Sequence, residues 1–117
     1  MKRIMIIDDY NLQIYLLENL LNDKYEIKSI NSAIGIKKKI EKYKPDLVIL
    51  DIVMPNKTGL EILNEIKDLT KVFIVSSINS SYIKKKAIEM GAKKYIEKPI
   101  NLEYFKNLID HELRYIM

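Results

Sequence analysis

Three runs of consecutive aliphatic residues constrain the fold of this chain more than any other feature of its sequence. They are KRIMIID at 2–8, DLVILD at 46–51 and KVFIVS at 71–76, and each ends in acidic or hydroxyl side chains. Continuous rather than alternating Ile, Val and Leu is typical of strands covered on both faces, as in parallel sheets. Two shorter candidate strands lie at 25–30 and 94–97. The sequence therefore predicts five buried strands.

Segments whose apolar residues recur at helical spacing lie between these strands and after the last one, so five helices are expected. The apolar stripes are Leu12, Leu16, Leu17, Leu20 and Leu21; Ile36, Ile40 and Tyr43; Ile62, Leu63, Ile66 and Leu69; Ile83, Ala87 and Met90; and Phe105, Leu108, Ile109, Leu113 and Ile116. Thr58 with Glu61 has the capping-box pattern, which predicts the start of the third helix. Asn101 is expected to cap the start of the fifth helix and Gly91 the end of the fourth.

Five strand–helix units with short connections predict an α/β fold with a doubly wound parallel sheet, because right-handed crossovers place helices on both faces. A chain of 117 residues with 48% hydrophobic composition is long enough for one core, so we expect one domain over 1–117. In such sheets, ligands bind beyond the carboxyl ends of the strands. The polar residues that follow the strands are therefore the candidates for function.

The composition also argues against several classes of function. The chain has no cysteine, which excludes disulfides, thiolate metal sites and a thiol nucleophile. Its net charge of +4 includes lysine runs at 37–39 and 84–86, which are typical of solvated helix faces, so we expect no direct binding of nucleic acid. The apolar run at 4–7 is too short for a signal peptide or a membrane span, so we expect a cytoplasmic protein without membrane insertion.

Polar side chains at the ends of the predicted strands should converge on one edge of the sheet. They are Asp8, Asp9, Asp51, Ser76, Ser77 and Lys98. Three carboxylates close together repel one another, so a cation or raised pKa values must compensate. An all-oxygen site indicates Mg2+, which binds one or two carboxylates together with water and phosphate oxygens.

With Mg2+ bound, one carboxylate remains free to act as a nucleophile and to form an aspartyl phosphate. Lys98 can place its charge on the phosphoryl oxygens, and the Ser76 hydroxyl can donate a hydrogen bond to another of them. The set of side chains is complete for phosphoryl transfer.

Each of these residues also has a purely structural interpretation. Asp8 and Asp9 could cap the following helix, Lys98 before a proline could be an ordinary loop residue, and Ser76 could be a satisfied hydroxyl at a strand end. The coincidence of polar residues after the first, third, fourth and fifth strands favours one site over four separate loops.

Four motifs, in order along nearly the whole chain, carry a family resemblance. They are IIDD at 6–9, LVILDIVMP at 47–55 followed by Gly59, IVSS at 74–77 and GAKKYIEKP at 91–99. On these residues the chain resembles the receiver domain of two-component response regulators, in particular the single-domain chemotaxis regulators. The resemblance implies a flavodoxin-like (βα)5 fold with strand order 2-1-3-4-5.

The resemblance also implies a role for each acid. Asp51 would be the phosphoacceptor, and Asp9 would bind Mg2+ directly together with Asp51 and the backbone carbonyl of Val53. Asp8 would act on the metal mostly through water.

A second group of residues would bind the phosphoryl group and transmit its presence. Ser76, with Ser77 beside it, takes the place of the switch hydroxyl, Lys98 that of the phosphate-pairing lysine and Tyr95 that of the rotating aromatic. Pro99 would follow a cis peptide bond, which is plausible only before proline. Phosphorylation would draw Ser76 toward the phosphate and let the Tyr95 ring turn inward.

The resulting function is that of a signalling switch rather than an enzyme acting on other substrates. A histidine kinase or a phosphotransfer protein would phosphorylate Asp51, and the surface of the fourth helix, fifth strand and fifth helix would signal to a protein target. Because the chain ends at Met117, directly after the fifth helix, we expect a stand-alone receiver that is monomeric when unphosphorylated. The alternative is the N-terminal receiver domain of a larger DNA-binding or enzymatic response regulator.

Two other classes of protein fit less well. A phosphatase-like hydrolase with Asp51 as nucleophile would need a general acid and a lid, and neither is evident in the sequence. A nucleotide- or flavin-binding module would need a glycine-rich loop, but there are only 3 glycines and none follows the first strand.

Apolar Val53 and Ile78 flank the expected path of attacking water, and we expect them to shield the acyl phosphate.

Overall fold

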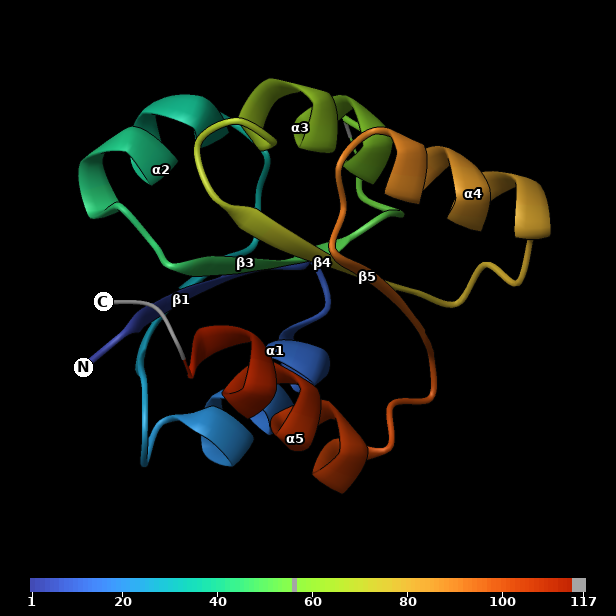
Figure 1. Ribbon diagram of the computed structural model, residues 1–117. Coiled ribbons are helices and arrows are strands. Elements are labelled where there is room, and N and C mark those ends of the chain that lie inside the picture. Colours follow the sequence, from blue (N-terminus) through green and yellow to red (C-terminus); the bar gives the residue numbers. More distant parts are fainter. Residues whose placement is uncertain (56, 115–117) are drawn as a thin grey trace.

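The computed structural model describes residues 1–55 and 57–114 as a sheet between two layers of helices (Figure 1). The elements are β1 (Arg3–Ile7), α1 (Asn11–Leu21), β2 (Glu26–Ile30), α2 (Ile36–Tyr43), β3 (Leu47–Asp51), α3 (Gly59–Ile66), β4 (Lys71–Ser76), α4 (Ser81–Glu89), β5 (Lys94–Glu97) and α5 (Leu102–Leu113). The predicted alternation of five strands and five helices is confirmed. Ile116, which we predicted on the fifth helix, lies outside the described residues.

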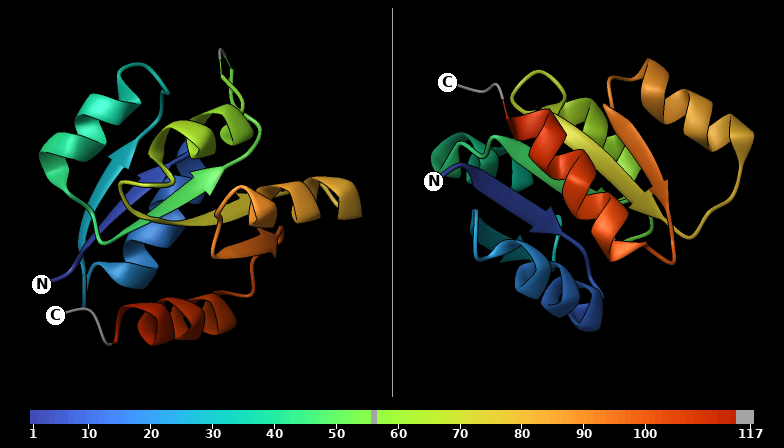
Figure 2. Two further views of the ribbon diagram at one scale, coloured as in Figure 1. Left: turned by 45° about the horizontal axis from the view of Figure 1, so that its top comes forward. Right: turned by 60° about the horizontal axis from the view of Figure 1, so that its bottom comes forward.

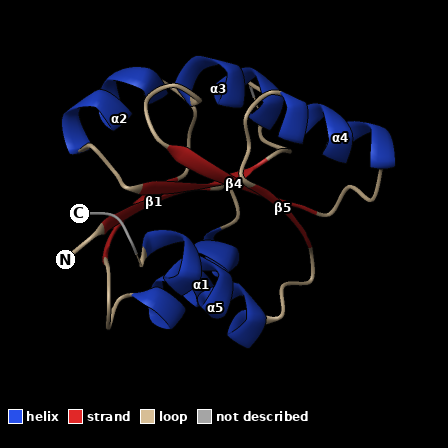
Figure 3. Ribbon diagram, in the orientation of Figure 1, coloured by secondary structure: helices blue, strands red, loops and turns tan. Residues whose placement is uncertain are grey.

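The sheet has the strand order β2-β1-β3-β4-β5, and every pairing in it is parallel. α1 and α5 cover one face and α2, α3 and α4 the other, as Figure 3 shows. This is the predicted doubly wound, flavodoxin-like fold. Because β1 has β2 on one side and β3 on the other, the winding reverses at β1 and β3. Residues that follow these two strands therefore lie at the place where ligands bind in such sheets.

The aliphatic runs supply a core to both faces, because successive side chains of a strand point to opposite sides. Along β1, Met5 and Ile7 belong to the core under α2, α3 and α4, whereas Ile4 and Ile6 belong to the core under α1 and α5. All four side chains are fully buried. The two views of Figure 2 show the helices of both layers against the sheet. This double burial holds the ends of β1 and β3 in place.

The predicted starts of two helices are confirmed by their caps. Thr58 and Glu61 form the capping box of α3, with the Thr58 side chain accepting a hydrogen bond from the Glu61 backbone N–H. The Asn101 side chain accepts from the backbone N–H of Tyr104 at the start of α5. A cap that the sequence analysis did not single out is Ser80, whose hydroxyl oxygen accepts from Ile83 N–H at the start of α4.

Two of the predicted apolar stripes were partly wrong. In α1 the buried residues are Ile14, Leu17 and Leu21, whereas Leu12 and Leu16 are exposed. The helix is rich in leucine, so more than one stripe fits the helical spacing, and packing against the sheet selects the one that contains Ile14.

Among the described residues, no helix is both long and apolar enough to cross a membrane.

The third stripe is also shorter than predicted. α3 ends at Ile66, and Leu69, which we placed on the apolar stripe of this helix, is 43% exposed in the turn that follows. The four buried residues of α3 lie within its eight residues, so the helix covers its part of the sheet before Leu69 is reached.

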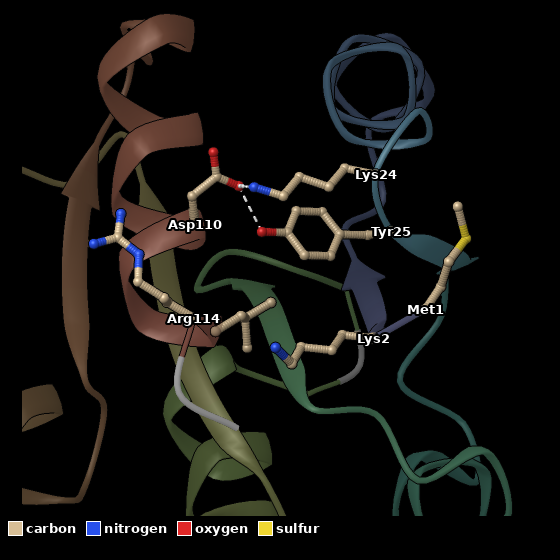
Figure 4. A pocket seen from close by; sticks show the side chains of 7 residues that line it. Met1, Lys2, Lys24, Tyr25, Asp110 and Arg114 are labelled. Atoms are coloured by element: carbon tan, nitrogen blue, oxygen red, sulfur yellow. Dashed lines mark hydrogen bonds and ion pairs between the residues drawn. The ribbon is translucent and has the colours of Figure 1, made fainter. Parts of the chain in front are cut away.

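Polar contacts at the amino edge of the sheet tie α5 to the turn before β2. The Tyr25 hydroxyl donates to Asp110 at 2.5 Å, and the Lys24 ammonium lies 3.2 Å from the same carboxylate, beside a cavity of about 700 Å³ (Figure 4). Burial acts to raise the pKa of Asp110, but the hydrogen bonds from Tyr25 and Lys24 hold it below its usual value. Lys106 of α5 also pairs with Asp23 at 3.5 Å. These contacts fix α5 at the edge opposite the one where β1 and β3 end.

Candidate functional site

Three aspartates meet at the carboxyl edge of the sheet. Asp8 and Asp9 directly follow β1, and Asp51 ends β3, the strand paired with β1. One carboxylate oxygen from each of the three lies within 4.8 Å of the others. Asp8 and Asp51 are only 3% and 6% exposed, whereas Asp9 is exposed. The structure thus brings together the acids that the strand ends singled out.

The two buried carboxylates are held by backbone amides of the loops that leave the strands. The N–H of Tyr10 donates to Asp8 Oδ1 at 2.9 Å, and the N–H of Val53 donates to Asp51 Oδ1 at 3.2 Å. Burial raises the pKa of Asp8, while the Tyr10 hydrogen bond and the charge of Lys98 oppose the rise. Each of these two acids therefore keeps its second oxygen, Oδ2, turned to other partners.

The capping interpretation of Asp8 and Asp9 does not describe this structure. The N-cap residue of α1 is Tyr10, and no side chain forms a cap hydrogen bond there. Asp8 instead accepts a hydrogen bond from the loop two residues on.

A lysine completes the charge arrangement. The Lys98 ammonium lies 3.5 Å from Asp51 Oδ2 and 3.7 Å from Asp8 Oδ2. Its backbone N–H donates to the Ser76 carbonyl at 2.8 Å, which joins the ends of β4 and β5, and the Lys98–Pro99 peptide bond is cis. Lys98 is therefore fixed at its backbone and directed at two of the three acids, unlike an ordinary loop lysine.

The side chain of Ser76 is linked to Tyr95 through a single residue of the loop that follows β4. The Ile78 N–H donates to Ser76 Oγ at 3.0 Å, and the Ile78 carbonyl accepts from the Tyr95 hydroxyl at 2.8 Å. Ser76 is fully buried and the Tyr95 ring is 9% exposed. The Tyr95 ring thus occupies the inward position, packed in the core with its hydroxyl bonded to this loop. This differs from our expectation that the ring turns inward on phosphorylation, because the ring is already inward without a phosphoryl group.

The backbone of Ile78 is the site feature that the sequence analysis missed. Its side chain was considered there only as a shield. No sequence signal could have revealed the link, because both hydrogen bonds use main-chain groups that every residue except proline carries.

Two other predicted residues lie at the rim of the site. Ser77, beside the buried Ser76, is exposed, and the Val53 side chain is 55% exposed. The contact of Val53 with the acids is made by its backbone, which follows Asp51 closely enough for the hydrogen bond described above.

The donor set suits a hard cation. Asp8, Asp9 and Asp51 each offer one oxygen atom to a common point, and together they could hold a metal ion. Hard divalent cations such as Mg2+ take oxygen ligands and typically use one or two carboxylates. The chemistry of the residues therefore fits the predicted cofactor.

Comparisons with known proteins identify the class to which this fold and acidic site belong. The response regulator receiver domain family matches residues 4–110, so the chain belongs to that family. The chemotaxis protein CheY of Halobacterium salinarum is 33% identical over 102 residues, covering 84% of this chain and 85% of that protein. The crystal structure of a CheY-like receiver domain protein from Methanospirillum hungatei is 28% identical, with a TM-score of 0.91, covering 97% of this chain and 94% of the other.

Other relatives are longer than this chain. The response regulator ArlR of Staphylococcus epidermidis is 34% identical over 107 residues, which cover 88% of this chain but 48% of that protein. Of five further curated relatives the chain spans between 9% and 56%. Similarity to these proteins thus concerns their receiver part.

Proposed function

We propose that Asp51 accepts a phosphoryl group, with Mg2+ bound beside it, from a histidine kinase or a phosphotransfer protein. The observation that supports this most is the pairing of a nearly buried Asp51 carboxylate with the Lys98 ammonium, inside a group of three acids. A nucleophilic carboxylate, a cation site and a fixed lysine are the parts that phosphoryl transfer to an aspartate requires.

The roles of the residues follow from their positions. An oxygen of Asp51 forms a bond to phosphorus while the bond from phosphorus to the donor histidine nitrogen breaks. Asp9, Asp51 and the carbonyl of Val53 would hold Mg2+ directly, and Asp8 would act on it mostly through water; the ion would supply positive charge next to the phosphoryl oxygens. Lys98 adds a second positive charge, and the Ser76 hydroxyl, whose oxygen already accepts from Ile78, has its proton available for a phosphoryl oxygen.

The signal would leave the site through Ser76 and Tyr95. A shift of Ser76 toward the phosphoryl group displaces Ile78, and Tyr95 responds because its hydroxyl is bonded to the same residue. Tyr95 and Pro99 line a groove of about 320 Å³ between α4, β5 and α5, which we propose as the surface read by a protein target. We propose that the protein acts in the cytoplasm and is monomeric when unphosphorylated.

A second candidate is supported by the lengths of the relatives. The transcriptional regulatory proteins YdfI and PhoP of Bacillus subtilis match 97% and 86% of this chain, but the matches span only 56% and 43% of those proteins. The same receiver chemistry would then control a DNA-binding or enzymatic output rather than a separate target. The length of the gene distinguishes the two cases.

Intact mass spectrometry after incubation with acetyl phosphate tests the proposed chemistry. With Mg2+ we expect one phosphoryl adduct on the wild-type protein, and with EDTA in place of Mg2+ we expect none, because the clustered acids repel an incoming dianion. Asp9→Asn should weaken Mg2+ binding, so that more Mg2+ is needed and the reaction is slower at a given Mg2+ concentration. An adduct that forms equally well in EDTA would contradict the metal's role, and no adduct under any condition would contradict the function.

Loss of the phosphoryl group should depend on Val53 and Ile78. Replacing both with asparagine is expected to speed hydrolysis at least about tenfold, because polar groups beside the acyl phosphate can orient the attacking water. The half-life of purified phosphoprotein measures this. Leu12→Asn, at an exposed apolar position on α1, is the matched control and should leave the half-life unchanged. Equal half-lives for all three proteins would refute the shielding hypothesis.

A further inference from the structure

The sheet has an open edge at β2. This strand is the first in the order β2-β1-β3-β4-β5, and among the described residues it pairs with β1 alone. In a parallel pair, the residues of a strand alternate between pointing both backbone groups at the neighbouring strand and pointing both away from it. The Ile30 carbonyl accepts from the Asp8 N–H at 3.1 Å, so the backbones of Ile30 and Lys28 face β1. The backbone groups of Ile27 and Ser29 therefore point away from the sheet.

A cavity of about 470 Å³ lies along this edge, and we call it the β2 groove. Residues 28–32 line it, together with Asn11 and Ile14 of α1 and Lys39 of α2. Since α1 and α2 cover opposite faces of the sheet, the groove lies between the two helix layers. An extended chain in this groove could form hydrogen bonds with the outward N–H and carbonyl of Ser29, as happens when a peptide adds a strand to a sheet.

The lining of the β2 groove is positively charged. Lys28 and Lys39 supply two exposed ammonium groups, and no acid lines the groove in the part of the chain that the structure describes. Glu18 of α1 lies nearby, but its carboxylate already accepts a hydrogen bond from the Ser29 hydroxyl at 2.9 Å. Lysines on an open edge oppose pairing with a neutral or basic strand, because burying an unpaired ammonium costs free energy. An acidic strand would remove that cost.

From the open backbone and the charge together we propose that the β2 groove binds an extended, acidic segment of a partner protein, which adds a strand to the sheet. Acidic side chains of this segment pair with Lys28 and Lys39, and its backbone pairs with that of Ser29. β2 and β5 are the two opposite edges of the sheet, so the β2 groove is separate from the groove at β5. A partner can therefore be held at β2 whether or not Asp51 is phosphorylated.

Selection from a phage-displayed library of random peptides on the full chain tests the proposal. We expect the enriched peptides to be rich in Asp and Glu, which pair with the lysines, and in β-branched residues, which favour extended structure. In NMR spectra of the chain with the most enriched peptide, the amides of Ile27 and Ser29 should shift most. A selection that returns no peptide, or only peptides without acidic residues, would overturn the proposal.

Ser29→Pro closes the edge to a further strand. Proline lacks the N–H, and it is tolerated on an edge strand where that N–H faces away from the sheet. By fluorescence anisotropy, Kd for the most enriched peptide should rise at least about tenfold, since one backbone hydrogen bond is lost and its partner is left unpaired. Ser29→Ala is the matched control, because it loses the hydroxyl that bonds to Glu18 but keeps the N–H. Its Kd should equal that of the wild type.

Lys39→Glu tests the charge without altering the strand. Kd for the same peptide should rise at least about threefold, the size of an exposed ion pair, and added NaCl should weaken binding to the wild type. Lys38→Glu is the matched control, because Lys38 is an exposed lysine on the same helix that lines a different cavity. If the peptide binds Ser29→Pro or Lys39→Glu as tightly as it binds the wild type, the proposal is refuted.

Analytical ultracentrifugation of the wild type alone distinguishes a partner protein from a second copy of this chain. We expect a monomer, because two copies joined at β2 would bring the lysines of both grooves close together. A dimer that Ser29→Pro dissociates would overturn the proposal in favour of self-pairing. The outcome is independent of the proposed function, because Asp51→Asn should bind the peptide as the wild type does.

Discussion

Asp51→Asn is expected to abolish formation of the phosphoryl adduct. The amide oxygen of asparagine is a poor nucleophile, and no other described acid combines burial with the contacts of Asp51 to Lys98 and to the Val53 N–H. Intact mass after incubation with acetyl phosphate and Mg2+ should show the unmodified protein alone. Asp8 and Asp9 are the nearest alternative acceptors, and an adduct that persists on Asp51→Asn would point to one of them.

The control for this substitution is Asp68→Asn. Asp68 is an exposed acid just beyond α3, so its replacement changes the net charge by the same amount without touching the site. It should be phosphorylated as the wild type is. An adduct on Asp51→Asn of the same mass and yield would place the phosphoacceptor elsewhere and would falsify the assignment.

Gly59→Ala should cause the largest loss of stability of any single methyl group added near the site. A Cβ atom at this position would lie 2.4 Å from the Cα of Ile52 and 2.7 Å from the carbonyl oxygen of Asp51, and these backbone atoms cannot move aside as a flexible side chain could. We expect a cost of about 3 kcal/mol, at the upper end of common overpacking penalties. For a chain of this size that lowers Tm by roughly 10 °C.

Gly35→Ala separates crowding from backbone strain. Gly35 has a φ of 66°, so alanine there is conformationally strained, but an added Cβ meets nothing within 4 Å. Its expected cost is about 1 kcal/mol, from the left-handed conformation alone. In Gly59→Ala the added methyl would crowd Ile52, the residue that follows Asp51. This variant should therefore also be phosphorylated more slowly while it remains folded. Equal melting temperatures for the two variants would show that the close approach at Gly59 is relieved at little cost.

Much of the fold follows from the sequence because the signals are strong and agree with one another. The aliphatic run at 71–76 coincides with β4, and the capping box at Thr58 marks the start of α3. Consecutive buried residues leave no exposed face, so the strands had to be covered on both sides. The position of the acids follows in turn, since parallel strands all end at one edge.

The details that sequence could not supply depend on packing. Whether Leu12 or Ile14 of α1 faces the sheet is decided by how the helix lies against β1 and its neighbours, and the helical spacing alone fits both. Likewise, Lys98 could be placed at the site by its strand, but its contacts with two carboxylates depend on the fixed ends of β4 and β5. Contacts between individual side-chain atoms cannot be predicted from the spacing of residues along the sequence.

The hydrogen bonds made by Ile78 have a consequence for how such a protein can evolve. Its N–H and carbonyl connect Ser76 to Tyr95, whereas its side chain lies partly exposed beside the site. Under the proposed function, mutation could therefore vary the side chain, and with it the lifetime of the phosphoryl group, while the backbone link from Ser76 to Tyr95 is kept. Of the twenty genetically encoded residues, only proline lacks the N–H that this route requires. At this one residue, selection could therefore change the lifetime of the phosphoryl group through the side chain without changing the backbone link between Ser76 and Tyr95.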